Sequence, residues 1–361
     1  MDKLKEIVLN FDIEHEIIDV KPLGEGLIND TFKVYAYGFD DPKYVLQRIN
    51  NSIFKDVDML QDNINKVTEH IRKKLVENNT TDVERKVLRF INTKDNKNYY
   101  FDGMKYWRLM TYISDSYTYQ CVTPEYSYTA GLAFGNFQYM LSDLSEPIGE
   151  TIPDFHNIEL RLAQLHDAVN NDVVGRAKDV KYYIDEIEKR AYDMCLGERL
   201  YKEGKLPKRI CHCDTKVNNM LFDKDGEVLC IIDLDTVMPS FIFSDFGDFL
   251  RSAANTGAED DKNLDNVDFN LEIFESFANG YLEGTKSFLL PIEKENLPYA
   301  AKLFPYMQAV RFLTDYINGD TYYKIQYPEH NLIRTKAQWK LFESAERKEK
   351  DMRDIIGICS F

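Results

Sequence analysis

The chain has 361 residues, an apolar content of 44% and a formal net charge of −16. Its length suits one large domain or two modest ones, and its apolar content is ample for a hydrophobic core. An acidic chain with no basic stripe is unlike a nucleic-acid-binding protein. We therefore expect no nucleic-acid partner, and the charge is compatible with a small neutral or cationic substrate.

Nothing in the sequence predicts export or membrane insertion. The N-terminal stretch MDKLKEIVLNFDIEHEI is charged and amphipathic, unlike a signal peptide. No uninterrupted apolar run of about twenty residues occurs. The cysteines show no secreted spacing pattern. We expect a cytoplasmic protein with reduced thiols and no membrane partner, and the sequence predicts no particular oligomeric state.

The N-terminal third of the chain predicts a small antiparallel sheet with one long helix. A short helix is expected over 1–16, and period-3.6 spacing of apolar residues predicts a long helix over 57–77. Alternating apolar residues and turn signals predict strands over 17–23, 31–37, 44–50, 85–92 and 99–113.

Gly24 and Gly26 lie between the first two predicted strands, in the sequence GEGLIND. A Gly-x-Gly between two strands is what a kinase uses to lay backbone N–H groups over phosphates, because glycine lets the backbone come close. The third glycine is missing, and the helix that a dinucleotide fingerprint requires does not follow. We expect these glycines to contact the nucleotide, and a simple hairpin turn is the alternative.

The third predicted strand, YVLQRIN, has the place of the strand that carries the phosphate-binding lysine in kinases, but it contains no lysine. We expect Arg48 to replace that lysine, because arginine keeps its charge and binds phosphate in a bidentate way. Gln47 is the alternative, and Glu69 is a candidate ion-pair partner of Arg48. The backbone groups that we expect to hold the adenine base belong to Thr111, Tyr112 and Ile113.

Beyond residue 113 the apolar spacing predicts mostly helices. We expect them over 126–144, 157–169, 178–202, 246–255, 269–288, 297–318 and 334–356. We accordingly predict a nucleotide-binding N-terminal lobe at 1–113 and a helical C-terminal lobe at 114–361 with the catalytic loop, metal site and acceptor site. His156 is expected to brace its loop rather than to bind substrate.

The stretch ICHCDTKVNNMLFDKDGEVLCIIDLD carries the strongest chemical signal. His212-x-Asp214 precedes Asn219, and a hairpin with the turn DKDG ends at Asp233. Folding at the turn brings Asp233 back beside Asn219, so that carboxylate and amide oxygens converge as Mg²⁺ ligands. In kinase-type phosphoryl transfer an Asp accepts the proton of the acceptor hydroxyl, while an Asn and a second Asp bind the metal. We expect Asp214 to orient the acceptor as catalytic base, and Lys216 to reach the transferring phosphoryl group.

Two other interpretations of this region are disfavoured. Asp245-Phe246-Gly247 spells the metal-binding DFG of protein kinases, but it follows the hairpin by about a dozen residues. We expect Asp245 and Asp248 to start a helix or brace a loop instead. Cys211 and Cys213 have no second Cys/His pair at zinc-finger spacing, so we expect buried thiols rather than a zinc site.

The segments HCDTKVNNMLFD, CIIDLDTVMP and DFGDFLR resemble the aminoglycoside phosphotransferase and choline kinase superfamily, and more narrowly the N-acetylhexosamine 1-kinases. AFGNFQ at 133–138 and RIN at 48–50 resemble the same family. The resemblance implies an α+β, two-lobed, protein-kinase-like fold with a small antiparallel-sheet N-terminal lobe and a larger, mostly helical C-terminal lobe. It also implies ATP and Mg²⁺ as cofactors, and transfer of the γ-phosphoryl group to the anomeric hydroxyl of an N-acetylhexosamine.

The same resemblance implies that a helical insert near the C-terminus faces the acceptor, with Arg311 and Tyr322 as sugar contacts. The sequence departs from the family pattern at Leu27, where the related sugar kinases have a histidine. The motif chemistry by itself leaves open a kinase of another small alcohol (choline, homoserine or an aminoglycoside) and a nucleotide-binding pseudokinase. A protein kinase is disfavoured, because no Ala-Pro-Glu follows.

Overall fold

The computed structural model describes residues 3–24, 29–119 and 122–358. The chain forms two compact units, each assembled from separated segments. The first unit combines Met1–Thr118, Asp143–Pro153 and Asn218–Met238, and the second combines Tyr119–Ser142, Asp154–Val217 and Pro239–Phe361. The first unit thus extends the N-terminal lobe that we predicted at 1–113 and adds two later segments, one of which is the predicted hairpin.

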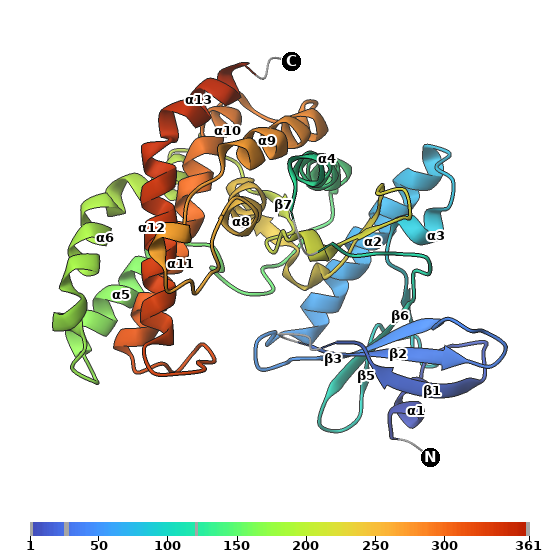
Figure 1. Ribbon diagram of the computed structural model, residues 1–361. Coiled ribbons are helices and arrows are strands. Elements are labelled where there is room, and N and C mark those ends of the chain that lie inside the picture. Colours follow the sequence, from blue (N-terminus) through green and yellow to red (C-terminus); the bar gives the residue numbers. More distant parts are fainter. Residues whose placement is uncertain (1–2, 25–28, 120–121, 359–361) are drawn as a thin grey trace. The chain divides into compact units, whose positions relative to one another are not determined.

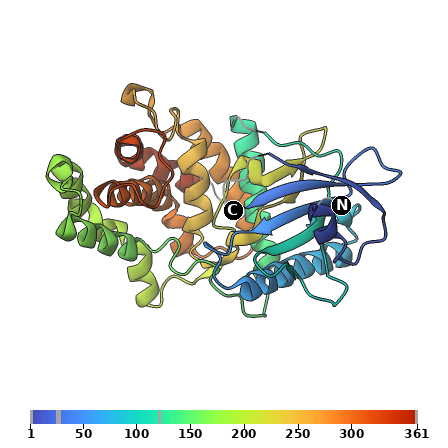
Figure 2. The same ribbon diagram turned by 90° about the horizontal axis from the view of Figure 1, so that it is seen from below.

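The first unit is built on an antiparallel sheet of six strands, in the order β1-β2-β3-β6-β4 with β5 also paired to β6 (Figure 1). Figure 2 shows these strands running side by side. Their bounds are β1 Ile17–Pro22, β2 Asp30–Ala36, β3 Tyr44–Ile49, β4 Phe90–Ile91, β5 Tyr100–Phe101 and β6 Tyr106–Thr111. The first three predicted strands are confirmed. Arg85 and Lys86, which open the fourth predicted strand (85–92), instead end the short helix α3 (Val83–Lys86), and only Phe90–Ile91 of that stretch forms a strand.

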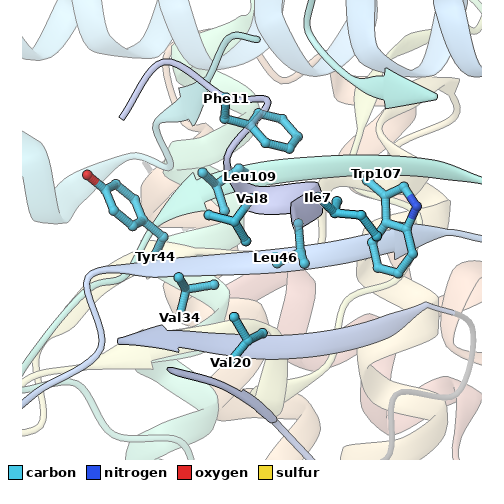
Figure 3. Close-up of a cluster of buried hydrophobic side chains, with 9 residues drawn as sticks. All are labelled: Ile7, Val8, Phe11, Val20, Val34, Tyr44, Leu46, Trp107 and Leu109. Atoms are coloured by element: carbon cyan, nitrogen blue, oxygen red, sulfur yellow. The ribbon is translucent and has the colours of Figure 1, made fainter. Parts of the chain in front are cut away.

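One face of the sheet is apolar and is covered by the short helix α1 (Lys3–Val8). Successive side chains of a strand point to opposite faces, so Tyr44 and Leu46 of β3 share this face with Leu109 of β6, which pairs with Leu46. Figure 3 shows how these side chains meet those of α1. The buried cluster consists of Ile7, Val8, Phe11, Val20, Val34, Tyr44, Leu46, Trp107 and Leu109.

The long helix α2 (Val57–Glu77) has the bounds that its apolar period predicts. It begins after Asp56, whose side chain caps the helix by accepting the Met59 N–H at 2.9 Å. Asn63, on its buried side, exchanges two hydrogen bonds with the backbone of Gly149, at 2.7 and 3.0 Å. These bonds attach the segment Asp143–Pro153 to the first unit, although it is remote in sequence.

The predicted hairpin is present as β8 (Met220–Phe222) and β9 (Val228–Ile231), which pair antiparallel. The short 3₁₀ turns η2 (Val217–Asn219) and η3 (Leu234–Thr236) flank it. The hydrogen bonding between the two strands continues one residue beyond them, because the Ile232 N–H donates to the Asn219 carbonyl at 2.9 Å. The two ends of the hairpin are therefore adjacent, as the turn predicted.

The second unit is mostly helical, with one short two-stranded pair, β7 (Arg209–Cys211) and β10 (Met238–Ser240). Where single helices were predicted over 178–202 and 334–356, the chain breaks near Cys195 and at Lys348. No helix in the described ranges is long and apolar enough to span a bilayer. The helices are α4 Pro124–Leu141, α5 Ile158–Asn171, η1 Ala177–Val180, α6 Lys181–Met194, α7 Leu196–Lys202, α8 Phe243–Ala253, η4 Leu264–Asn266, α9 Leu271–Thr285, α10 Pro291–Glu295, α11 Leu297–Ile317, α12 His330–Arg347 and α13 Glu349–Ile358.

Helices α4 and α9 pack very closely, because glycines occupy the contact on both helices: Gly131 and Gly135 on α4, and Gly280 and Gly284 on α9. A Cβ atom added to Gly280 of α9 would lie 2.0 Å from the Tyr128 carbonyl oxygen, and one on Gly131 of α4 would lie 2.2 Å from that of Phe277. Both obstacles are backbone atoms, which cannot move aside as a flexible side chain can. This pair of helices therefore tolerates no side chain at the contact, and its position is rigidly defined.

We predict that Gly280→Ala lowers the free energy of unfolding by about 1–3 kcal/mol, the usual cost of inserting a methyl group into a packed interior. Chemical denaturation would measure it. Gly357→Ala on α13 is the matched control, because a Cβ at Gly357 meets no atom within 4 Å. Equal stability of the two variants would contradict the close packing described above.

Candidate active site

The predicted catalytic loop follows β7 in the second unit and is held by a buried aspartate. The carboxylate of Asp245, on α8, accepts the backbone N–H groups of His212 at 3.0 Å and Cys213 at 2.8 Å. The Asp245 carbonyl in turn accepts the Thr215 hydroxyl at 2.8 Å. The predicted loop-bracing role of Asp245 is thus confirmed. Its predicted place at a helix start is also confirmed, because Asp245 lies in the first turn of α8, after the N-cap Ile242.

Asp245 is itself held by the glycine-packed helix pair. The Gln138 side-chain amide on α4 donates to its carboxylate at 2.7 Å, and the Tyr281 hydroxyl on α9 donates to the Gln138 carbonyl oxygen at 2.7 Å. Burial raises the pKa of Asp245, and His212 with the two backbone N–H donors opposes that rise. A buried chain of hydrogen bonds thus connects the α4–α9 helix pair, through Gln138 and Asp245, to the backbone of the loop.

A second aspartate, Asp248, supports the other end of the loop. It accepts the Thr215 N–H at 3.1 Å and pairs with Arg251 at 3.5 Å. Burial raises the pKa of Asp248 to about 6, Arg251 opposes the rise, and the nearby charge of Asp214 adds to it. Its loop-bracing role, like that of Asp245, is confirmed.

Asp214 and Lys216 lie next to each other in this loop. The Lys216 ammonium is 2.5 Å from the Asp214 carboxylate. Burial by itself would lower the pKa of Lys216, but Asp214 and Asp248 raise it, so Lys216 remains a cation at neutral pH. Cys213, directly before Asp214, has a φ of 61°. A left-handed backbone at a residue with a side chain is sparsely populated, and such residues concentrate at functional sites.

The predicted metal ligands Asn219 and Asp233 belong to the first unit and lie at the two ends of the hairpin. Asn219 is 7% exposed, and its backbone carbonyl receives the Ile232 N–H. Asp233 directly follows Ile232 and has a φ of 62°. A carboxylate and an amide brought to one end of a hairpin fit Mg²⁺, which prefers oxygen ligands and takes its remaining ones from phosphates and water.

Arg48 and Gln47, the two candidates for the strand cation, point to opposite faces of the sheet. Arg48 shares its face with Leu46 and the α1 cluster, and pairs with Asp30. Gln47 lies on the other face, where its side chain accepts the Nε–H of Arg108 at 2.9 Å. The role of Arg48 stays a prediction, and the buried cation on the second face is Arg108.

The remaining nucleotide predictions concern backbone groups. Gly24 has a φ of 64°, and nothing lies within 4 Å of the position of a Cβ, so its conformation rather than crowding favours glycine. Gly26 and Leu27 lie outside the described residues. The N–H groups of Thr111 and Tyr112 donate to the carbonyls of Arg89 and Lys43, both at 2.9 Å. An adenine contact by Thr111 or Tyr112 would therefore use their carbonyl oxygens.

Arg311 and Tyr322, predicted as sugar contacts, line one cavity of the second unit, of ≈ 430 Å³. The cavity lies between α5, α11 and the loop after α11. The buried carboxylate of Asp315 shapes that loop by accepting the N–H groups of Tyr322 at 2.8 Å and Tyr323 at 2.9 Å. The Arg311 guanidinium lies 5.6 Å from the Tyr323 ring centroid, at cation–π distance.

A second arginine, Arg161, lines the same cavity. Burial and the charge of Arg311 lower the pKa of Arg161. Arg161 donates to the carbonyls of Asp154 and Phe155 and to Gln164, and Arg311 donates to Gln308. Within the described ranges neither guanidinium forms an ion pair with a carboxylate. The cavity lining thus contains two guanidinium groups together with the carboxylates of Asp167 and Asp315, and it offers hydrogen-bonding groups to a polar ligand.

His156 lies near this cavity and stays neutral. Burial and the charges of Arg311, Arg161 and Arg251 keep its pKa well below the usual range. Its ring stacks on Phe155 with centroids 4.3 Å apart. These packing contacts agree with the predicted bracing role.

Sequence reasoning missed three residues that the structure places beside the candidate site. Gln138 was noted only as part of the segment AFGNFQ, and Arg108 and Asp235 were not singled out. Arg108 did carry a signal, because it is a charged residue inside the apolar strand WRLMT, and a buried charge requires a partner. That partner is Asp235, which forms a buried ion pair with it.

Comparison with known proteins agrees with this architecture. Residues 19–281 match the phosphotransferase enzyme family APH. An aminoglycoside phosphotransferase from Alicyclobacillus acidocaldarius superposes with a TM-score of 0.63 at 12% identity, covering 98% of this chain and 96% of that one. A choline/ethanolamine kinase family protein from Mesorhizobium loti gives 0.58 at 16% identity, covering 98% and 100%. Spectinomycin phosphotransferase APH(9)-Ia, in complex with ADP and spectinomycin, gives 0.55 at 13% identity, covering 99% and 97%.

The family match spans well over half of the chain, so the protein belongs to the APH phosphotransferase enzyme family. The predicted α+β fold, with an antiparallel-sheet N-terminal region and a helical C-terminal region, is confirmed. The superfamily resemblance seen in the sequence is likewise confirmed, while the narrower N-acetylhexosamine 1-kinase assignment stays a prediction.

We predict that Asp245→Asn lowers the free energy of unfolding by about 1–3 kcal/mol, because an amide cannot accept all the donors that meet this carboxylate. It should also lower turnover while leaving ADP affinity within about twofold, since the loop that it distorts carries the catalytic residues. Denaturation, turnover and calorimetric ADP binding measure the three effects. Asp193→Asn is the matched control, because Asp193 is exposed, and a wild-type-like Asp245→Asn variant would refute the bracing role.

Proposed function

We propose that this phosphotransferase is an ATP-dependent small-molecule kinase that phosphorylates the anomeric hydroxyl of an N-acetylhexosamine, GlcNAc or GalNAc, to give the sugar 1-phosphate. Family membership supports the kinase class. The acceptor proposal depends chiefly on the cavity of the second unit, with its two arginines and the tyrosine pair Tyr322 and Tyr323. A cytoplasmic location stays a prediction.

The candidate residues divide the chemistry between them. Asp214 orients the acceptor hydroxyl and takes its proton, and Lys216 neutralises charge on the transferring phosphoryl group. Asn219 and Asp233 would hold Mg²⁺, which when bound would offset the negative charge of the phosphates. Gly24, Gly26, Arg48 and the segment Thr111–Ile113 are the proposed nucleotide contacts.

The charge of the cavity favours some acceptors over others. Choline, ethanolamine and aminoglycosides are cations, which the guanidinium groups of Arg161 and Arg311 would repel, although Asp167 and the backbone-bonded Asp315 also line the cavity. The acetamido carbonyl of an N-acetylhexosamine accepts hydrogen bonds from arginine without adding positive charge, and the tyrosine rings offer stacking faces for a sugar. The second candidate is a small alcohol with a carboxylate, such as homoserine, because a carboxylate also suits two arginines.

We predict ADP release with ATP and Mg²⁺ on GlcNAc or GalNAc, and phosphorus NMR should place the new phosphate on the anomeric oxygen. The screen includes plain hexoses, choline, homoserine and kanamycin. Asp214→Asn should abolish turnover but still bind ATP, and unchanged turnover would refute its role as base. Turnover only on homoserine would keep the mechanism and replace the acceptor. No turnover on any compound, with ATP still bound, would favour a pseudokinase.

We predict that Arg311→Met raises the KM for the accepted sugar at least tenfold while the KM for ATP stays within about twofold, because the lost group contacts the acceptor alone. Steady-state kinetics with each substrate varied in turn separates the two. Arg334→Met is the matched control, since Arg334 is an arginine of α12 that does not line the cavity. A larger effect on ATP than on the sugar would contradict the acceptor role.

A further inference from the structure

A buried polar cluster in the first unit joins segments that are far apart in sequence. Its centre is the ion pair of Arg108 on β6 and Asp235 in η3, which are 2% and 3% exposed. Asn29, Gln47 and Thr151 also belong to it. Charged groups this deeply buried are costly unless they are paired and hydrogen-bonded, so their partners define where each segment must lie.

The guanidinium of Arg108 is held in one orientation from the sheet side. Its Nε–H donates to the Gln47 side-chain oxygen at 2.9 Å, and the Gln47 amide donates to the Thr31 hydroxyl at 3.1 Å. Gln47 pairs directly with both residues across the sheet. The three neighbouring strands thus aim a planar, permanently charged donor at Asp235.

Asp235 accepts hydrogen bonds at both carboxylate oxygens and at its backbone carbonyl oxygen. One carboxylate oxygen pairs with Arg108, and the other accepts the Asn29 side-chain amide at 2.5 Å. Its backbone carbonyl accepts the Thr151 hydroxyl at 2.8 Å. Asp235 lies two residues after Asp233, inside the 3₁₀ turn η3, which begins directly after Asp233. Each bond to Asp235 therefore restrains the turn that orients the Asp233 side chain.

Asn29 links the same carboxylate to the segment that contains the glycines. It is 7% exposed, and besides donating to Asp235 it accepts the Asn50 N–H at 2.9 Å. Asn29 is three residues after Gly26. One carboxylate thus holds both the turn after Asp233 and the residue at which the glycine-containing segment joins β2.

We propose that Arg108 and Asp235 are positioning residues for phosphoryl transfer, which set the direction of the Asp233 carboxylate toward Mg²⁺, with Asn29 as a further restraint on Asp235. This inference rests on the proposed function, in which Asp233 holds the metal. The pair contacts neither the phosphates nor the metal. It acts by allowing the turn only one arrangement, so that Mg²⁺ meets a preoriented ligand.

The experiment must separate positioning from stability. A single change at Arg108 leaves an unpaired buried carboxylate, so we choose the double variant Arg108→Met/Asp235→Asn, which removes both charges and restores neutrality. Calorimetry on the full chain would measure ADP binding with excess Mg²⁺ and with EDTA, and kinetics would measure the Mg²⁺ dependence of turnover. Arg72→Met is the matched control in the same unit, because Arg72 forms a bidentate but half-exposed pair with Glu84.

The double variant should unfold cooperatively, bind ADP with Mg²⁺ at least tenfold more weakly, bind ADP with EDTA within twofold of wild type, and require more Mg²⁺ for half-maximal turnover. A purely structural pair would show none of these differences once the variant folds, and that result would overturn the proposal. If the double variant does not fold, Asn29→Ala keeps the ion pair and removes one restraint. It should weaken Mg²⁺-dependent ADP binding at least threefold, and wild-type binding would overturn the proposal.

Asp233→Asn in the same series distinguishes this proposal from the proposed function. If Asp233→Asn abolishes the effect of Mg²⁺ on ADP binding while the double variant behaves as wild type, only the positioning role is refuted. If Asp233→Asn also leaves the Mg²⁺ effect intact, the metal assignment in the proposed function is refuted, and the positioning role is refuted with it.

Discussion

The candidate catalytic loop depends on one buried carboxylate that accepts backbone N–H groups. Asp245 fixes the chain at His212 and Cys213, just before Asp214. The carboxylate stays in place because Gln138 donates to it and the α4–α9 contact positions Gln138. Ionised acceptors form stronger hydrogen bonds than neutral ones, which suits a backbone that must hold the left-handed conformation of Cys213.

A buried, hydrogen-bonded carboxylate also lies next to the candidate metal site in the first unit. Asp235 is a buried carboxylate close to a left-handed residue, Asp233, and it is satisfied by Arg108 and Asn29 rather than by backbone groups. In both units a carboxylate that we predict to act in the site thus has a buried second carboxylate nearby in sequence or space. Asp245 and Asp235 thus order the backbone next to Asp214 and Asp233, the two carboxylates that we predict to act in the site.

Predictions from local sequence succeeded where neighbouring residues determine the outcome. The turn DKDG and the apolar strands beside it predicted that the two ends of a hairpin come together, and the Ile232 N–H does donate to the Asn219 carbonyl, one residue before Asp233. Local sequence could not decide whether Arg48 or Gln47 replaces the strand lysine of kinases. Strand alternation places them on opposite faces, but only the packing of α1 shows which face is apolar. Arg108 was missed because its partner Asp235 lies 127 residues away.

Local patterns were enough to identify the phosphotransferase family, most strands and helices of the sheet region, and the motif with Asp214, Asn219 and Asp233, since turn chemistry, apolar period and motif spacing act over a few residues. The packed fold was needed to see which buried charges pair, that Asp245 braces a loop from inside α8, and that Arg161 lines the same cavity as Arg311. A buried polar group is satisfied by whichever partner the fold brings within hydrogen-bond distance, and sequence separation does not limit that choice.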